Sequence, residues 1–252
     1  MLFLIGTGLS YDDISSKAVD ACSSCEVYYE SYTSFMSKEK LDFIRSKIKK
    51  DIKELYRSDL EEGISSIVAM AKRADIAILV GGDPLIATTH KTIMIEAKKN
   101  GVATKIIHSA SIVPAAIGES GLDFYRFGQV CTIPKWSEKY KPVSFYEIIE
   151  RNVSNNLHTI VLLDFDHKEG RSLDCADAIN TLKIAEGKYQ KKIITDDTAI
   201  IIMHNLSLSG EQKIISKVGL AGKISFNSGP TLIIIPSKMS DIEKEVVAAM
   251  YG

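Results

Sequence analysis

The sequence predicts an α/β protein whose first half forms a parallel sheet and whose second half forms a mixed sheet. The first half alternates strands with helices, and its strands are short, continuous apolar runs. Such runs are typical of parallel strands that helices cover on both faces. The second half contains strands joined by turns as well as by helices, which favours a mixed sheet. A chain of 252 residues has room for two domains of roughly 100–150 residues, and we place them at residues 1–113 and 114–252.

The elements of the first half follow from apolar runs and from helix-capping residues. Residues 2–5 form a buried strand that stops at Gly6-Thr7-Gly8. Asp12 or Asp13 then caps a helix that runs to about residue 24. Further strands are expected at residues 26–29, 76–80 and 104–107. Helices are expected at residues 86–100 and 111–118, and two surface helices fill the charged, periodic stretch 37–73.

The second half is read in the same way. Strands are expected at residues 129–133, 159–163, 199–203, 223–226 and 232–235. Helices are expected at residues 144–153, 173–186 and 241–250. The string Asn227-Ser228-Gly229-Pro230 is a turn between two neighbouring strands. No flexible linker separates the halves, so we expect the two domains to pack tightly.

The composition excludes several classes of protein. The 31 basic and 32 acidic residues give a net charge of −1, so nonspecific binding has no electrostatic basis and no nucleic-acid partner is expected. The apolar runs are about five residues long, whereas a membrane-spanning helix needs roughly 20. The apolar N-terminus lacks the basic residues of a signal peptide. The four cysteines are therefore expected to be free thiols in the cytoplasm.

Three short motifs follow predicted parallel strands directly. They are Ile5-Gly6-Thr7-Gly8, Gly81-Gly82-Asp83-Pro84 and His108-Ser109-Ala110-Ser111. The carboxyl ends of such strands are where open α/β sheets bind ligands. The alternatives are a tight turn for the first motif, a type I turn for the second and a helix cap for the third. The dinucleotide-binding fingerprint is incomplete, because Tyr11 occupies the third glycine position and Glu30 is the nearest acidic candidate.

Other kinds of chemistry lack a signature in this sequence. Cys22 and Cys25 have no second pair to complete a metal site, and the five histidines form no ligand-spaced pair, so no metal is expected. No nucleophile elbow or Walker A motif is present. These absences favour a reaction that needs mainly positioning, such as the transfer of an already activated group.

Seven strings carry a resemblance to a known family. They are LIGTGL at 4–9, YYESYTS at 28–34, GGDPLIATTH at 81–90, IHSASI at 107–112, GLDFYRFGQVCTIPKW at 121–136, HTIVLLDF at 158–165 and GPTLIII at 229–235. Together they cover nearly the whole chain in order. In these strings the chain resembles the diphthine synthases, a family in the tetrapyrrole methylase-like class of S-adenosylmethionine-dependent methyltransferases.

The resemblance implies a fold, a cofactor and a reaction. The fold is two α/β domains with S-adenosylmethionine in the cleft between them, and the assembly is a homodimer. The reaction methylates the amino group of the 3-amino-3-carboxypropyl-histidine of translation elongation factor 2, giving diphthine and S-adenosylhomocysteine. The chain lacks the extra stretch and the tail of eukaryotic members, so the archaeal-type, trimethylating form is expected. The alternatives are a tetrapyrrole or other small-molecule methyltransferase of the same fold, and a non-catalytic module that binds a nucleotide or a translation partner.

The resemblance also implies the site residues, motif by motif. The implied cofactor contacts are Leu9, Asp83, Ile86, Ser111, Ile112, Leu163, Leu206 and Thr231. Two of these lie where the chain departs from the family, which usually has an Ala-Arg-Ala-Gly-like string in place of residues 204–207 and a histidine in place of Thr231. The residues expected to face the acceptor are Tyr32, Thr33, Thr88, Thr89 and His90. We assign no general base.

The implied contacts suggest how the cofactor is held. We expect Asp83 and the backbone of Gly81 and Gly82 to bind the methionine amino group or the ribose, and Ser111 to bind the carboxylate. The apolar contacts Leu9, Ile86, Ile112 and Leu163 would pack around the adenine.

Overall fold

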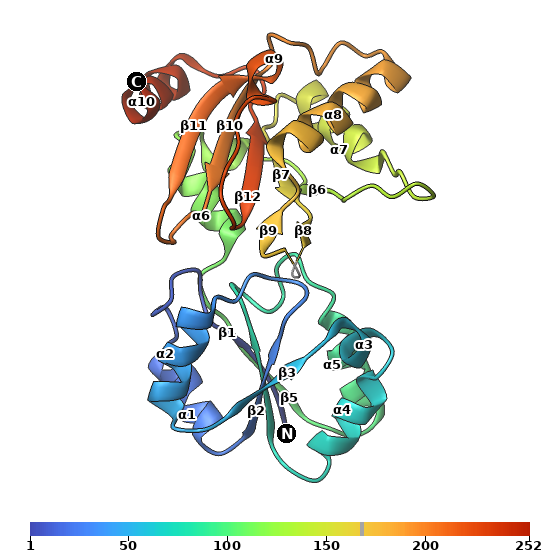
Figure 1. The fold of residues 1–252 in the computed structure, drawn as a ribbon, viewed down its shortest axis with the longest axis vertical. Helices are drawn as coiled ribbons and strands as arrows, with labels where there is room; N and C mark the ends of the chain where they lie inside the picture. Colours follow the sequence, from blue (N-terminus) through green and yellow to red (C-terminus); the bar gives the residue numbers. More distant parts are fainter. Residues whose placement is uncertain (167–168) are drawn as a thin grey trace. The chain divides into compact units, whose positions relative to one another are not determined.

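A computed structural model of the protein describes residues 1–166 and 169–252 (Figure 1). The chain divides into two compact units, Met1–Ile112 and Val113–Gly252, and each is described by itself. His167, one of the histidines considered above, lies outside the described residues. Within the described ranges, no helix is both long enough and apolar enough to cross a bilayer. The four cysteines are free and buried, which fits a structural role.

The first unit is built on a parallel sheet of five strands in the order β3-β2-β4-β1-β5, as expected for the first half. Its strands are β1 (Leu2–Gly6), β2 (Glu26–Glu30), β3 (Ile52–Leu55), β4 (Ile76–Val80) and β5 (Thr104–Ile107). Strands β1 and β4 are buried along their whole length. Their continuous apolar runs therefore reflect cover on both faces of the sheet.

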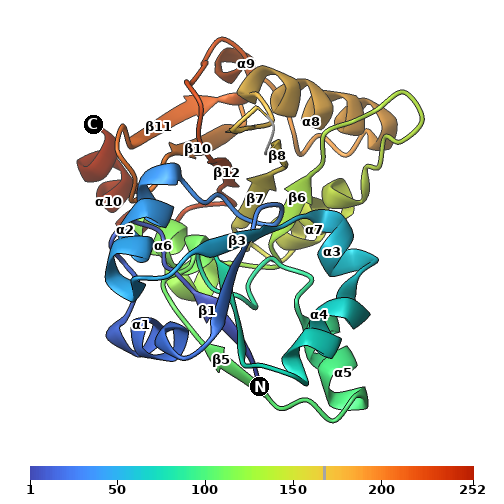
Figure 2. The same cartoon turned by 60° about the horizontal axis from the view of Figure 1, so that its bottom comes forward.

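Five helices provide that cover. They are α1 (Ser16–Ser23), α2 (Lys38–Ile48), α3 (Arg57–Glu61), α4 (Ile64–Ala71) and α5 (Lys91–Lys99). Helices α1 and α2 pack on one face of the sheet and α3 to α5 on the other (Figures 1 and 2). Because side chains alternate along a strand, Leu4 packs with the α4 and α5 side chains, while Ile5 packs with those of α1 and α2.

Three expectations for the first unit are wrong. The stretch 37–73 contains strand β3 in addition to its helices. Only the end residues of β3, Ile52 and Leu55, are buried, so this edge strand has no apolar run. Helix α1 is capped by Ser15, which accepts from the Ala18 N–H, and not by Asp12 or Asp13. Helix α5 begins at residue 91, after a loop.

The second unit contains the mixed sheet expected for the second half, in the order β11-β10-β12-β7-β6. Its strands are β6 (Cys131–Ile133), β7 (Thr159–Leu163), β10 (Ala199–His204), β11 (Gln212–Lys217) and β12 (Thr231–Ile235). The β6–β7 pair is parallel and the other pairs are antiparallel. A small antiparallel pair, β8 (Phe165–Asp166) and β9 (Arg171–Ser172), stands apart from this sheet.

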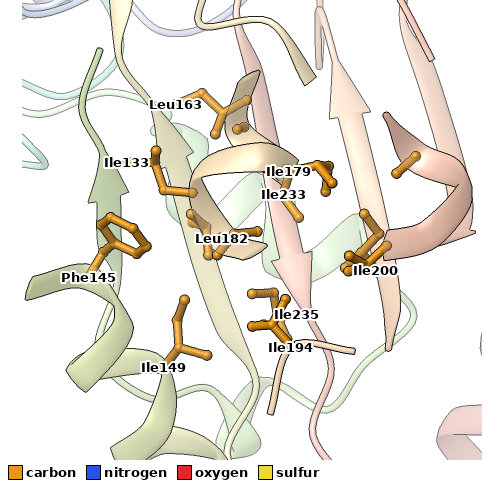
Figure 3. Close-up of a cluster of buried hydrophobic side chains, with 14 of the residues drawn as sticks. Ile133, Phe145, Ile149, Leu163, Ile179, Leu182, Ile194, Ile200, Ile233 and Ile235 are labelled. Carbon is orange, nitrogen blue, oxygen red and sulfur yellow. The ribbon is translucent and has the colours of Figure 1, made fainter. Parts of the chain in front are cut away.

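The helical segments of the second unit cover its sheet. They are α6 (Ile112–Glu119), the 3₁₀ turn η1 (Phe124–Arg126), α7 (Ser144–Ser154), α8 (Cys175–Tyr189), α9 (Val218–Ala221) and α10 (Asp241–Tyr251). Side chains of α7 and α8, including Phe145, Ile149 and Leu182, meet Ile200 and Ile233 of the sheet in one apolar cluster (Figure 3). The core of this unit lies between these helices and the sheet.

The strand expected at residues 223–226 is absent, and β11 takes the edge position instead. Strand β11 has no buried residue, and its two adjacent isoleucines are too few to stand out as an apolar run. The apolar residues after α9 pack as a loop: Phe226 stacks on His204 with ring centroids 4.5 Å apart and an interplanar angle of 8°. The turn at residues 227–230 therefore does not join two neighbouring strands.

A buried ionic cluster fixes the start of α10. The Glu243 carboxylate accepts from the Ser240 N–H (2.7 Å), the Asp123 N–H (3.0 Å) and His158 Nε2 (2.9 Å), and it also pairs with Arg126. Because the N–H of Ser237 donates to His158 Nδ1, the ring proton is on Nε2 and points at Glu243. These bonds hold the pKa of Glu243 at about 2 against the raising effect of burial, and burial lowers the pKa of His158.

Candidate functional site

The first sheet has one place where its connections diverge. Strands β1 and β4 are neighbours, but the chain leaves β1 towards β2, beyond β4, and leaves β4 towards β5, beyond β1. Helix α1 follows β1 on one face of the sheet, and α5 follows β4 on the other. Open α/β sheets bind ligands in the crevice at such a switch point, outside the carboxyl ends of the strands. The two glycine motifs lie at this point.

Backbone contacts between these glycines join the two loops at the place where such a crevice would lie. The Gly8 N–H donates to the Gly82 carbonyl (3.2 Å), and the Gly82 N–H donates to the Gly8 carbonyl (2.9 Å). Both residues have positive φ angles, +74° and +69°, which favour glycine. A Cβ atom on Gly6 would lie 2.6 Å from the Gly82 carbonyl oxygen. The close approach of the two loops therefore requires glycine at these positions.

The Asp83 carboxylate joins the ends of β4 and β5. Its Oδ1 accepts from the Leu85 N–H (3.0 Å), and its Oδ2 accepts from His108 Nδ1 (2.8 Å) and from the Ser109 N–H (3.2 Å). Asp83 is only 6% exposed. Its carboxylate thus organises the two loops, and its role as a cofactor contact stays a prediction.

Two further side chains hold the loop after β1. The Asp13 carboxylate accepts from the N–H groups of Leu9 and Ser10, both at 2.8 Å. From α2, the amine of Lys40 donates to the Gly8 carbonyl at 2.6 Å. Lys40 has no distinguishing signal in the sequence, because it lies in a helix segment rich in charged residues.

The loop after β2 is organised by a buried acid. Glu30 is fully buried, and its carboxylate accepts from the N–H groups of Tyr32 (3.1 Å) and Thr33 (2.8 Å) and from the hydroxyls of Thr33 (2.6 Å) and Ser34 (2.8 Å). The Tyr32 hydroxyl lies 2.9 Å from the Thr89 hydroxyl. The structure therefore brings together Tyr32, Thr33 and Thr89, three of the residues expected on the acceptor side.

Two side chains of the loop between β4 and α5 bind the same backbone carbonyl. The hydroxyl of Thr88 (2.7 Å) and Nδ1 of His90 (3.0 Å) both donate to the Pro84 carbonyl. This bond places the ring proton of His90 on Nδ1, and Nε2 is buried with no hydrogen-bond partner among the described residues. Ala87 has a left-handed φ of +56° and the neighbouring Ile86 is 44% exposed, so the loop presents an apolar side chain to solvent.

The remaining predicted contacts of the first unit lie near these loops in the chain. Ser111 is buried, 7% exposed, and follows the Ser109 amide that Asp83 holds. Its hydroxyl forms no hydrogen bond with the described residues, so it is available to a ligand. Leu9 and Ile112 are half-buried.

In the second unit, three predicted contacts lie at the ends of neighbouring strands of the mixed sheet. Leu163 ends β7, Leu206 follows β10 and Thr231 begins β12. Because β12 pairs antiparallel with both β7 and β10, these three positions lie at the same end of the strands. The Thr231 hydroxyl lies 2.8 Å from His204 Nδ1. Their assignment as cofactor contacts rests on the family resemblance. Within the described ranges, no group of three His, Cys, Asp or Glu side chains is arranged to hold a metal ion.

Comparison with known proteins places the chain. Residues 1–221 match the family of tetrapyrrole (corrin/porphyrin) methylases. The chain is 34% identical to the diphthine synthase of Methanothermobacter thermautotrophicus, across 100% of this chain and 96% of that protein. It is 35% identical to the diphthine synthase of Methanosphaera stadtmanae, across 99% of this chain and 95% of that protein. A crystal structure of a diphthine synthase superposes with a TM-score of 0.86 and 29% sequence identity, across 100% of this chain and 96% of that one. The chain therefore belongs to the tetrapyrrole methylase family, and within it to the diphthine synthases.

Proposed function

We propose that this protein transfers methyl groups from S-adenosylmethionine to the amino group of the 3-amino-3-carboxypropyl-histidine of translation elongation factor 2, and that three transfers give diphthine. The observation that carries the proposal is the full-length similarity to proteins named diphthine synthase. The glycine loops at the switch point of the first sheet, where open α/β sheets bind ligands, are compatible with a cofactor site. The reaction is a step of diphthamide biosynthesis.

The residues of the crevice fit the cofactor. Gly6, Gly8 and Gly82 allow its backbone to approach a ligand closely. The exposed Ile86 offers an apolar surface for the adenine, together with the half-buried Leu9. The free hydroxyl of Ser111 is suited to the methionine carboxylate. We propose these contacts with Asp83 as the residue that fixes the loops, and we assign Ile112, Leu163, Leu206 and Thr231 as further contacts on the resemblance alone.

The chain's own contribution to the reaction is alignment. When bound, S-adenosylmethionine supplies a methyl group already activated by its sulfonium. The acceptor amine must be placed in line with that methyl group, and such positioning alone accelerates a transfer strongly. We propose that the Tyr32–Thr89 hydrogen bond and the Glu30-bound loop form the acceptor side. The proton released by the amine passes to solvent.

The proposal extends to partners and compartment. Elongation factor 2 is the protein substrate, the active assembly is a homodimer, and the site of action is the cytoplasm. The net charge of −1 supports recognition by local contacts, because a broad positive field that would attract RNA is missing.

Product mass tests the proposed function. Elongation factor 2 from a strain blocked at this step is incubated with the enzyme and S-adenosylmethionine, and the modified histidine peptide is analysed by mass spectrometry. We expect the mass of three methyl groups on that peptide, and none on a factor whose target histidine is replaced. A fourth methyl group would overturn the trimethylation proposal. An unchanged peptide would overturn the proposed substrate, and methylation of a tetrapyrrole instead would support the other activity of this fold.

A further inference from the structure

Lys40 is a buried cation beside the crevice. It lies on α2 and is only 2% exposed, and its amine donates to the Gly8 carbonyl at 2.6 Å. Burying an ammonium group is costly unless it is paired and hydrogen-bonded. The contacts that this amine makes must therefore offset the cost of burying it.

The bond of Lys40 is made to the atom that joins the two glycine loops. The Gly8 carbonyl also accepts from the Gly82 N–H at 2.9 Å. The ammonium therefore fixes the same oxygen that connects the loop after β1 to the loop after β4. The residue that follows, Leu9, is an implied cofactor contact, and its N–H is held by Asp13.

The charge of Lys40 is sensitive to pH near neutrality. The charged groups that face the amine are Asp13 and Asp12, both from the loop after β1. Burial lowers the pKa of Lys40 to about 8, and the two carboxylates oppose this shift. At pH 7 the amine is charged, and it loses its proton as the pH rises through about 8.

We propose that Lys40 is a positioning residue for the cofactor, whose charged amine holds the Gly8 carbonyl and with it the glycine crevice in the binding geometry. The inference rests on the proposed function, because it takes S-adenosylmethionine as the ligand. A lysine with a merely structural role would change the stability of the fold and leave the pH dependence of cofactor binding untouched.

Three variants test the proposal. Lys40→Met keeps the apolar stem and removes the amine, Lys40→Arg keeps a charge that does not titrate in the range used, and Lys38→Met is the control on the exposed first turn of α2. The Kd of S-adenosylmethionine is measured by calorimetry between pH 6.5 and 9.5, with urea unfolding of each variant. The ionisation of the ligand itself cancels in the ratio of two variants at one pH.

At pH 7, Lys40→Met should bind at least about tenfold more weakly than the wild type, the change expected for one lost hydrogen bond to a charged group. The ratio should shrink towards one as the pH rises through about 8, because the wild type then loses its charge. Lys38→Met should match the wild type throughout.

An unchanged Kd in folded Lys40→Met, or a ratio that stays constant with pH, would overturn the proposal. If Lys40→Met does not fold, the comparison moves to Lys40→Arg, against which the wild type must lose affinity above pH 8; a constant ratio there would equally overturn it. Failure of the wild type to bind S-adenosylmethionine at any pH would instead refute the proposed function.

Discussion

Replacing Asp83 by Asn tests whether the carboxylate organises the crevice. The side chains of aspartate and asparagine have nearly the same shape, so the change only removes the charge and replaces one acceptor oxygen by an N–H₂ group. The carboxylate uses both oxygens, one for the Leu85 N–H and one for His108 Nδ1 and the Ser109 N–H. Whichever way the amide turns, an N–H₂ group faces an N–H donor of the protein.

The cost follows from the exposure of each partner. The His108 side chain is 67% exposed, so water replaces its lost bond and this pair contributes at most about 1 kcal/mol. The Ser109 N–H is partly buried, and losing a bond from such a group to a carboxylate costs about 1.5–3 kcal/mol. The two contributions together give about 1.5–4 kcal/mol, which corresponds to roughly 10- to 900-fold in an equilibrium constant.

This cost must appear in one of two measurements. If the loops keep their shape, the free energy of unfolding falls by the full amount, which urea denaturation measures. If the loops relax to recover hydrogen bonds with water, stability is regained but the crevice loses its geometry, and the Kd of S-adenosylmethionine rises. Asp51→Asn, at an exposed position before β3, should change neither quantity. Asp83→Asn with both quantities unchanged would refute the reasoning.

Three further variants and one control probe other parts of the structure. Gly6→Ala places a Cβ 2.6 Å from a carbonyl oxygen and should raise the Kd of S-adenosylmethionine more than about tenfold. The control Gly187→Ala, in open space within α8, should stabilise the fold by up to about 1 kcal/mol. An equal change of the Kd in both variants would contradict this prediction. Glu30→Gln should raise the KM for elongation factor 2 and leave the cofactor Kd unchanged, and the reverse pattern would remove Glu30 from the acceptor side. Glu243→Gln should lower the free energy of unfolding by about 3 kcal/mol at pH 7, because the pKa of Glu243 in the wild type is lowered from 4.5 to about 2. Urea unfolding should show this wild-type advantage above pH 4.5 and its loss towards pH 2, where protonation of His158 also destabilises the fold.

The fold could be predicted where burial leaves a pattern. Strands β1 and β4 are apolar at almost every position because helices cover both faces of the sheet, and the sequence shows this directly. The edge strands β3 and β11 face solvent or the sheet margin, so charged residues interrupt them and no period stands out. Conversely, Ile224 and Phe226 look like a strand, but they are apolar because they pack against the core as loop residues.

The site could be predicted only as far as its motifs. The glycines were identifiable because close backbone approach demands glycine, and the strings around them matched a family. The roles of the polar side chains could not be read in the same way. Asp83 stands in a motif that suggests ligand binding, yet its hydrogen bonds go to the protein. Lys40 becomes a buried neighbour of Gly8 only through the packing of α2 beside the loop after β1.

Glu30 distinguishes the switch point of this sheet from that of a dinucleotide-binding fold. In those folds an acidic residue at the end of the second strand binds the ribose hydroxyls. Glu30 ends β2 in the same position, but it is fully buried and accepts four hydrogen bonds from the loop that follows. A carboxylate with four donors around it has no free lone pair for a ribose. We therefore expect ligand binding at this switch point to use the glycine backbone and apolar side chains, while Glu30 holds the loop after β2, which we propose as the acceptor side.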